Sequence, residues 1–339
     1  MAGRVVITPT EPIPLPSNQP PARFYRGGQR ISDFRHEPPS PPNTPEDWVG
    51  STTSVRGQSP VGMTRLTDGR LLADAISADP AAWLGPDHVT RFGDDAMLLV
   101  KLLDAGQRLP VHAHPGGAFA ATHLSAAHGK AEAWYILSPG TVHLALTRSL
   151  APEELRALVS GQNSAGMLAL MHEVTVEPGD RVFVPPGVLH AIGEGILLAE
   201  VQEPEDLSIL LEWDGFDLDG EKDGHLGLGF DLALTAVETR GRTEAEVDAL
   251  VVRAGPIDRM LPTEADRYFR LDRVEARQDF HAGFGIVISL HESVRLTAAG
   301  QAPRALPAGS TTLVPYAAGD FSIEGMALLA RPPAPRNRD

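Results

Sequence analysis

The 339-residue sequence contains no cysteine, which excludes disulfide bonds, thiolate metal ligands and a cysteine nucleophile. It also lacks any apolar run that approaches the ~20 residues of a membrane-spanning helix. The first residues, MAGRVVITPTEPIPLP, do not contain the apolar core of a secretion signal. We therefore expect a cytoplasmic protein without a membrane anchor.

Positive charge is scarce as well. Lys and Arg total 29 against 44 Asp and Glu, which gives a formal net charge of −15. An acidic surface repels phosphate backbones and anionic lipid heads, so we expect neither nucleic acid nor a membrane as a partner. An anionic substrate would have to be captured by a local positive pocket.

The composition favours a mostly β fold. Apolar residues make up 42% of the chain, enough to bury a sizeable core. Glycine (33) and proline (30) are common and separate short runs rich in Val, Ile and Leu. This pattern is typical of many short strands joined by tight turns.

The first 45 residues predict a proline-rich strap. Prolines crowd positions 9–45, and each removes a backbone hydrogen-bond donor, so we expect no regular structure there. Phe24, Tyr25 and Phe34 offer apolar points of attachment. We interpret residues 1–45 as an ordered strap along the surface of a barrel.

Residues 46–215 predict that barrel. Segment 71–84 has helical spacing up to Ser77, and Asp79-Pro80 can start a second short turn. Segment 149–171 interrupts the strand pattern as a helical insertion with Ser149 as its N-cap. Short apolar segments predict the barrel strands: 96–103, 109–114, 131–137, 141–146, 181–184, 189–193 and 196–202.

The last third of the chain predicts a connection and a second barrel. Residues 216–255 are expected to connect the two barrels and to end in a helix over 243–253, because Thr243 and Glu246 form a capping-box pattern. Residues 256–339 return to short alternating strands. We interpret them as a second, smaller barrel without a metal site.

Four side chains form a candidate metal site. In the segment VHAHPGG, His112 and His114 are two residues apart on a predicted strand and so point to the same face. Glu132 lies among apolar neighbours, where a bare carboxylate is costly, although Lys130 could simply pair with it. His190 follows the turn Pro-Pro-Gly. Alone, each of these histidines is more often structural than a ligand.

Together the four side chains predict a metal centre, because separate strands each deliver a nitrogen or oxygen ligand. This ligand set suits Zn²⁺, and also Fe²⁺ or Mn²⁺. The order of His-x-His, Glu, Pro-x-Gly and His resembles the signature of the cupin superfamily, a mostly β fold built on a double-stranded β-helix.

The order of motifs over residues 46–331 resembles the cupin-type phosphomannose isomerases of the short bacterial class. The similar segments are EDWVGSTTS (46–54), LLVKLLDAGQRLPVHAHP (98–115), GKAEAWYIL (129–137) and FVPPGVLHAIGEGILLAEVQEPEDL (183–207). The resemblance implies a zinc-dependent aldose–ketose isomerase that acts on sugar 6-phosphates. It also implies that His114, Glu132 and His190 bind the metal and that Lys130 lies in the active site.

The sequence departs from the family pattern at two places. The Gln-x-His-Pro motif of the family reads His112-Ala113-His114-Pro115 here, which adds an imidazole. The Tyr-Arg pair that follows the family's Glu-x-Gln-x-Pro-x-Asp stretch is replaced by Leu207-Ser208-Ile209-Leu210-Leu211. A leucine cannot stabilise negative charge, so either another cation substitutes or the substrate and reaction differ.

Isomerisation through an enediol(ate) needs a base beside the metal. The candidates on inward strand faces are Lys130 and Glu200, with Gln202 as a hydrogen-bonding group. A phosphate on the substrate would need Lys130 together with a residue from the strap or from the Ser51–Ser54 segment.

Two other functions stay open from the sequence. A three-histidine, one-glutamate site with iron or manganese supports dioxygen chemistry in redox cupins. A sugar-binding protein without turnover would keep the metal pocket and lose the arginine. In the isomerase interpretation the partner is a small-molecule sugar or sugar phosphate, and the chain could form a homodimer.

Overall fold

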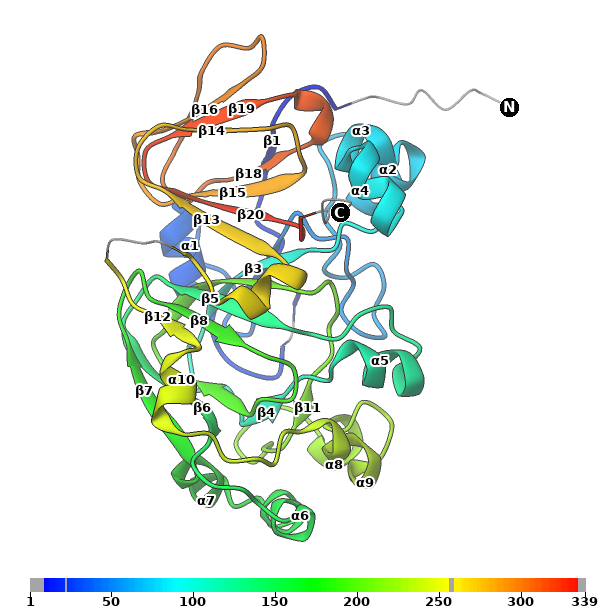
Figure 1. The fold of residues 1–339 in the computed structure, drawn as a ribbon, viewed down its shortest axis with the longest axis vertical. Coiled ribbons are helices and arrows are strands. Elements are labelled where there is room, and N and C mark those ends of the chain that lie inside the picture. The colour runs from blue at the N-terminus through cyan, green and yellow to red at the C-terminus, as the bar shows by residue number, and fades with distance from the viewer. Residues whose placement is uncertain (1–8, 22, 256–258, 335–339) are drawn as a thin grey trace.

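Two β-barrels, one above the other in Figure 1, make up most of the molecule. The computed structural model describes residues 9–21, 23–255 and 259–334. Each barrel is built from two antiparallel sheets. The mostly β prediction is confirmed, with a helical insertion in the first barrel and a smaller second barrel.

The first barrel pairs a six-stranded sheet with a five-stranded one. All six residues of its central strand β3 (Leu99–Asp104) are buried, as are all six of β10 (Leu197–Gln202), because neighbouring strands and the facing sheet cover them. The six-stranded sheet has the order β12 (Val251–Val252), β8 (Arg181–Val184), β5 (Glu132–Ile136), β10, β3 and β2 (Glu46–Val49). The five-stranded sheet has the order β11 (Ile209–Leu210), β4 (His112–Ala113), β9 (His190–Ile192), β6 (Gly140–Leu146) and β7 (Met171–Val176).

The second barrel includes a strand from the opposite end of the chain. β1 (Ile13–Leu15) pairs with β18 through the register Pro14↔Thr312, at the edge of its sheet where proline is tolerated. Its first sheet has the order β1, β18 (Thr311–Val314), β15 (Gly285–Ser289), β20 (Ala327–Arg331) and β13 (Arg270–Val274). The other has the order β14 (Gln278–Phe280), β19 (Phe321–Glu324), β16 (Val294–Ala298) and β17 (Arg304–Leu306).

Short helices connect the strands and lie around the outside of the two barrels (Figure 1). α6 and α7 lie at the end of the first barrel far from the second, whereas α2 to α4 lie beside the second (Figure 1). No helix within the described residues has the length and apolar character needed to cross a bilayer. The α-helices are α1 (Gln29–Arg35), α2 (Leu72–Ala78), α3 (Pro80–Leu84), α4 (Pro86–Phe92), α5 (Gly117–Leu124), α6 (Pro152–Ser160), α7 (Ser164–Ala169), α8 (Gly220–Asp223), α9 (Phe230–Ala233) and α10 (Glu244–Asp248). Three short 3₁₀ helices are η1 (Leu234–Ala236), η2 (Thr263–Arg267) and η3 (Tyr316–Ala318).

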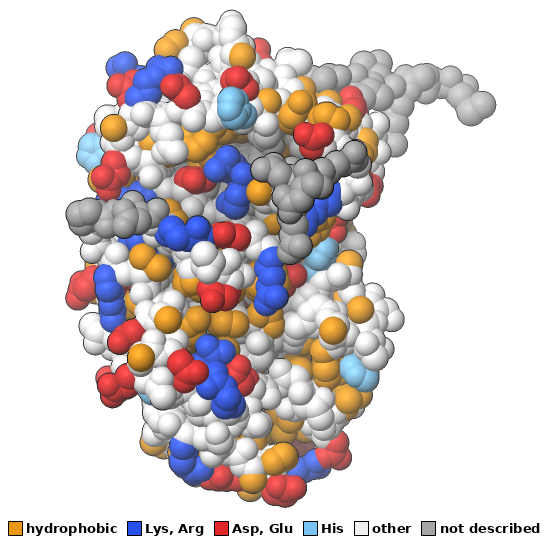
Figure 2. Space-filling view, in the orientation of Figure 1, with side chains coloured by type: hydrophobic (Ala, Val, Ile, Leu, Met, Phe, Trp, Pro, Cys, Tyr) orange, Lys and Arg blue, Asp and Glu red, His pale blue; other side chains and the backbone are white. Residues whose placement is uncertain are grey.

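One apolar core continues from the first barrel into the second. It includes Trp134 and Val182 of the first barrel together with Ile286 and Leu328 of the second. On the face shown in Figure 2, acidic and basic side chains are interspersed over both barrels. The two barrels therefore share buried apolar surface.

Three local predictions were wrong. The strap contains regular structure after all, because the stretch that forms α1 has no proline in it. Helix α6 begins after the N-cap Ala151 with Pro152 at its first position, and Ser149 does not cap it. The helix expected over 243–253 ends at Asp248, since Val251 and Val252 pair with β8 instead.

Candidate metal centre and active-site cavity

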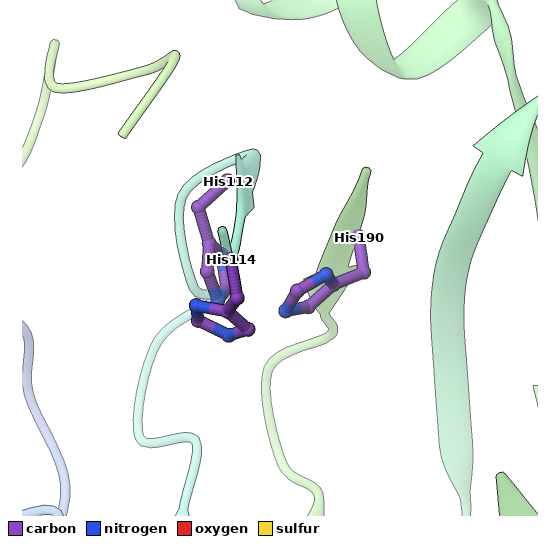
Figure 3. Close-up of side chains that lie close together, drawn as sticks. All are labelled: His112, His114 and His190. Carbon is purple, nitrogen blue, oxygen red and sulfur yellow. The ribbon is translucent and has the colours of Figure 1, made fainter. Parts of the chain in front are cut away.

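Three imidazoles from the five-stranded sheet of the first barrel converge at its centre. His112 lies on β4, His114 just after it, and His190 on β9, which pairs with β4 through His112↔His190. The ring centroids are 5.0 Å apart for His112 and His114, 4.0 Å for His112 and His190, and 4.8 Å for His114 and His190. Figure 3 shows the three rings gathered around a common point, and their ligand nitrogens could hold a metal ion.

Backbone carbonyls fix the orientation of each ring. The Nδ1 atoms lie 2.7 Å from the carbonyl oxygen of Pro110 for His112, 2.7 Å from that of Leu207 for His114, and 2.9 Å from that of Val188 for His190. A carbonyl oxygen only accepts, so each Nδ1 must carry the proton and donate it. Each Nε2 then presents a lone pair to the centre, which is the tautomer that binds a metal.

The carboxylate of Glu132 (β5) faces these lone pairs. Its Oε2 lies 2.9 Å from Nε2 of His114, and its Oε1 lies 3.3 Å from Nε2 of His190. Two acceptors at these distances repel each other unless a cation is close by. The ammonium of Lys130 supplies one for His114 and Oε2 of Glu132, but no cation of the described residues contacts Nε2 of His190. Among the described residues, Oε2 of Glu132 and Nε2 of His190 are buried without a hydrogen-bond partner. The donor set therefore fits a divalent metal ion.

The ionisation states also suit metal binding. Burial, reinforced by Lys130, lowers the pKa of His114 to about 3. Burial, together with the neighbouring His190 and His114, lowers the pKa of His112 well below its usual range. Burial raises the pKa of Glu132, but Lys130 and His114 outweigh it and lower that pKa well below its usual range. Neutral imidazoles and a charged carboxylate at neutral pH are the states that ligate a metal.

The turn before β9 places His190. Gly187 has a φ of +87°, a left-handed conformation that favours glycine, and its N–H donates to the carbonyl oxygen of His114 at 2.7 Å. A Cβ at this position would lie 3.1 Å from the carbonyl oxygen of Ala236. The Pro-Pro-Gly turn thus links the strand ends that carry His114 and His190.

Lys130 lies at the metal centre. Its ammonium nitrogen is 3.1 Å from Nε2 of His114 and 3.2 Å from Oε2 of Glu132. The Lys130–Glu132 contact considered from the sequence is therefore present, and it lies inside the same cluster as the imidazoles.

A second group of charges lines the same cavity. Glu200 (β10) and Lys101 (β3) are register partners, with Oε1 and Nζ 3.5 Å apart. Lys101 also lies 3.5 Å from Oε2 of Glu46 (β2). Arg23 of the strap places Nη2 3.5 Å from both Oε1 of Glu46 and Oδ1 of Asp206. The cavity is therefore lined by charges over most of its length.

Sequence reasoning missed Arg23, Glu46, Lys101 and Asp206. A lysine inside the apolar run AMLLVKLL was the available signal, because a buried strand tolerates a charge only beside partners. No comparable signal pointed to Arg23, because its proline-rich segment has no strand or helix period from which the position of a side chain could be predicted.

Two predicted participants lie outside the cavity lining. Gln202 is the register partner of Glu132, but its amide donates to the backbone oxygens of Glu203 and Glu205. Residues 52–54 line a separate hollow beyond Asp206. At the position of the family arginine, Ser208 and Leu210 line the cavity.

Comparison with known proteins relates the whole chain to one group of enzymes, although no protein-family model matches it. The mannose-6-phosphate isomerase ManA of Bacillus subtilis is 28% identical over 321 residues, covering 89% of this chain and 92% of that protein. A mannose-6-phosphate isomerase of Streptococcus mutans is 30% identical over 219 residues, covering 62% of this chain and 64% of that protein.

A solved structure supports the same relationship at the level of the fold. The mannose 6-phosphate isomerase of Bacillus subtilis matches with a TM-score of 0.66 at 20% identity, covering 94% of this chain and 98% of that one. The similarity thus extends over both barrels and over the segments that carry the three histidines and Glu132. Over nearly its whole length this chain is therefore similar to mannose-6-phosphate isomerases, and it has their fold.

Proposed function

We propose that the protein is a metal-dependent mannose-6-phosphate isomerase, which interconverts the aldose phosphate and its 2-ketose. The alignments with relatives that carry this name cover 89% and 62% of the chain. The observation that carries the proposal is a buried group of three imidazoles that could hold a metal ion, with Glu132 beside two of them and with Lys130 and Glu200 in the lining of the adjoining cavity.

The proposed metal ligands are His112, His114, His190 and Glu132. We propose Zn²⁺ as the ion, with Fe²⁺ or Mn²⁺ as alternatives that the same nitrogen and oxygen ligands accept. A bound divalent ion supplies Lewis acidity to the carbonyl and hydroxyl oxygens of the substrate. The backbone contacts of the three Nδ1 atoms hold the rings ready for it.

Glu200 and Lys130 are the proposed proton-transfer groups. In the aldose-to-ketose direction a base removes the proton from C2 and returns a proton to C1. The hydroxyl on C2 loses its proton and the carbonyl oxygen on C1 gains one. Burial and the nearby Glu132 raise the pKa of Glu200, which makes its carboxylate a stronger base than an exposed one. Lys130, at the metal centre, is placed to exchange a proton with the substrate oxygens.

The redox alternative has less support. His112 does complete a three-histidine, one-glutamate set, but the relatives over the length of the chain carry the names of isomerases. Lys101, Glu200 and Glu46 also line the cavity with charged groups suited to a polar sugar.

Hydrogen exchange at the substrate tests the proposal directly. Metal-replete protein is incubated with mannose 6-phosphate in heavy water, and products are analysed by NMR and mass spectrometry. We expect a 2-ketose phosphate, and deuterium at C2 of the recovered aldose. Glu200→Gln should lower the exchange rate by about 100-fold or more, in line with the loss of a general base. Absence of both product and exchange with Zn²⁺, Fe²⁺ and Mn²⁺ would refute the isomerase assignment.

A further inference from the structure

The cavity contains three cationic side chains, Arg23, Lys101 and Lys130, and they differ in what they already contact. Lys130 touches His114 and Glu132 at the metal centre. Lys101 lies between two carboxylates and places its ammonium 4.8 Å from the ring centre of Trp48. The side chain of Lys101 is only 3% exposed. Lys130 therefore has two close partners, whereas the ammonium of Lys101 is almost fully buried between two carboxylates at 3.5 Å.

Arg23 differs, because its donors are poorly used. Both of its ion pairs, to Glu46 and Asp206, involve Nη2 at 3.5 Å, which is long for a hydrogen bond. Its Nε is buried without a hydrogen-bond partner among the described residues. A guanidinium carries five N–H donors in a planar fork that matches phosphate oxygens. The side chain is 13% exposed, so this fork borders the cavity instead of lying behind its wall.

The position of Arg23 suits the far end of a sugar phosphate. Three successive ion pairs lead from Arg23 through Glu46 and Lys101 to Glu200, the proposed base. The reacting carbons C1 and C2 must lie by Glu200 and the imidazoles, and the chain of the sugar then extends away from them. A phosphate on C6 would lie toward the end of the cavity that Arg23 lines.

The strap holds this guanidinium in place before a substrate arrives. The N–H of Arg23 donates to the carbonyl oxygen of Asn43 at 3.0 Å, and the Asn43 amide donates back to the carbonyl oxygen of Arg23 at 3.2 Å. The next two residues are fixed as well, since the carbonyl oxygen of Phe24 accepts from the N–H of Asp217 and the hydroxyl of Tyr25 donates to Glu46. A cation anchored in this way loses little conformational freedom on binding.

The charge of the cavity is compatible with an anion once a metal is bound. Three cations face four carboxylates, those of Glu46, Glu132, Glu200 and Asp206. This leaves one excess negative charge, which a divalent ion turns into one excess positive charge. Such a pocket is the local positive field that an anionic substrate needs on a protein with a net charge of −15.

We propose that Arg23, supplied by the N-terminal strap, binds the phosphate group of the substrate and selects phosphorylated over free sugars. This assignment rests on the proposed function. It gives the strap a role in specificity as well as in packing.

Arg23→Gln and Arg23→Lys test the assignment, with Arg26→Gln as the matched control. Arg26 is exposed on the same strap and donates to the Gln107 side chain, away from the cavity. For Arg23→Gln we expect the KM for mannose 6-phosphate to rise about 10- to 100-fold, the usual loss for a hydrogen bond to a charged group. We expect kcat to change far less, Arg23→Lys to recover part of the loss, and Arg26→Gln to match the wild type.

Two further measurements separate binding of phosphate from a purely structural role. Turnover of free mannose should be the same in Arg23→Gln and wild type, whereas an equal loss for free and phosphorylated mannose would overturn the assignment. The affinity for inorganic phosphate, measured by calorimetry on the metal-loaded protein, should fall at least tenfold in Arg23→Gln. An unchanged affinity would also overturn it. The calorimetry does not need turnover, so it tests the role of Arg23 by itself. A wild-type protein that isomerises no sugar would refute only the proposed function.

Discussion

At the scale of single residues, the candidate metal centre is set by atoms outside the ligand set. Three backbone carbonyls hold the three Nδ1 protons and so leave each Nε2 lone pair free, with Glu132 close to those of His114 and His190. His112 is the position at which the family motif has glutamine. Its ring is anchored like the other two, so we infer that it acts as a ligand and not as a neutral spacer.

Substitution at His112 and His114 tests this inference. His112→Gln replaces the imidazole by an amide oxygen that still reaches the centre, so metal affinity should fall by less than about tenfold. His114→Ala removes a ligand that also contacts Glu132 and Lys130, so metal affinity should fall by well over 100-fold, more than the 10- to 100-fold typical of residues around the ligands. Competition with a chromogenic chelator measures both values. A metal affinity of His112→Gln equal to that of the wild type would contradict the inference.

At the scale of secondary structure, prediction from sequence worked where one local rule decided the outcome. Strand 181–184 was predicted with its observed bounds, and β5, β6 and β10 within a residue or so, because each is a short apolar run between turn residues. The capping box at Thr243 and Glu246 is also confirmed. Among the proposed metal ligands, His112 and His114 could be named from the period of a strand, Glu132 from its apolar neighbours and His190 from the turn before it.

The remaining elements depend on tertiary contacts that a sequence pattern does not encode. β12 is a strand only because Val251 and Val252 find an open edge at β8. β1 contains a proline and is a strand because β18 is available to pair with it. Arg23 likewise joins the site through the path of the strap, and nothing in its immediate neighbours predicts this.

The capping box of α10 gives a pH-dependent prediction for one element. Hydrogen bonds from the backbone of Thr243 and from the Arg240 side chain lower the pKa of Glu246 from 4.5 to about 2. Because the folded pKa is the lower one, this contribution to stability is present above pH 4.5 and is lost as the pH falls toward 2. Glu246→Ala should therefore lower the urea midpoint at pH 7 and have a progressively smaller effect below pH 4.5. Glu244→Ala, in the same first turn but outside the capping box, is the control, and a Glu246→Ala effect that does not depend on pH would exclude this explanation.

At the scale of the whole molecule, the strap connects the two barrels through Arg35 at the end of α1. Its Nε lies 2.9 Å from Oδ2 of Asp47 on β2 of the first barrel, with the two side chains 3% and 0% exposed. Its Nη1 donates at 3.0 Å to the hydroxyl of Thr311 on β18 of the second barrel. One guanidinium therefore contacts both barrels, and the N–H of Asn18 supplies Asp47 with a further donor at 2.7 Å.

Removal of this guanidinium should destabilise the protein far more than removal of a neighbouring one. Arg35→Ala leaves the buried carboxylate of Asp47 without its counter-ion, a change that costs about 3–5 kcal/mol. Arg30→Ala on the same helix should cost at most ~1 kcal/mol, because Arg30 is 45% exposed and its partner Asp104 keeps the N–H donors of Gly28 and residue 30.

The pH dependence of the Arg35→Ala effect identifies its cause. Burial raises the pKa of Asp47 more than Arg35 lowers it, so this carboxyl group is protonated more readily than an exposed one. Arg35 stabilises the fold only when Asp47 is charged, so the cost of Arg35→Ala should grow as the pH rises from 4 to 8. Adding Asp47→Asn to Arg35→Ala should recover part of the lost stability at pH 8 and little at pH 4, because the second substitution removes the unpaired charge. Urea unfolding of the four proteins at both pH values measures these differences, and an equal cost for Arg35→Ala and Arg30→Ala would show that the barrels are held together by their apolar contact alone.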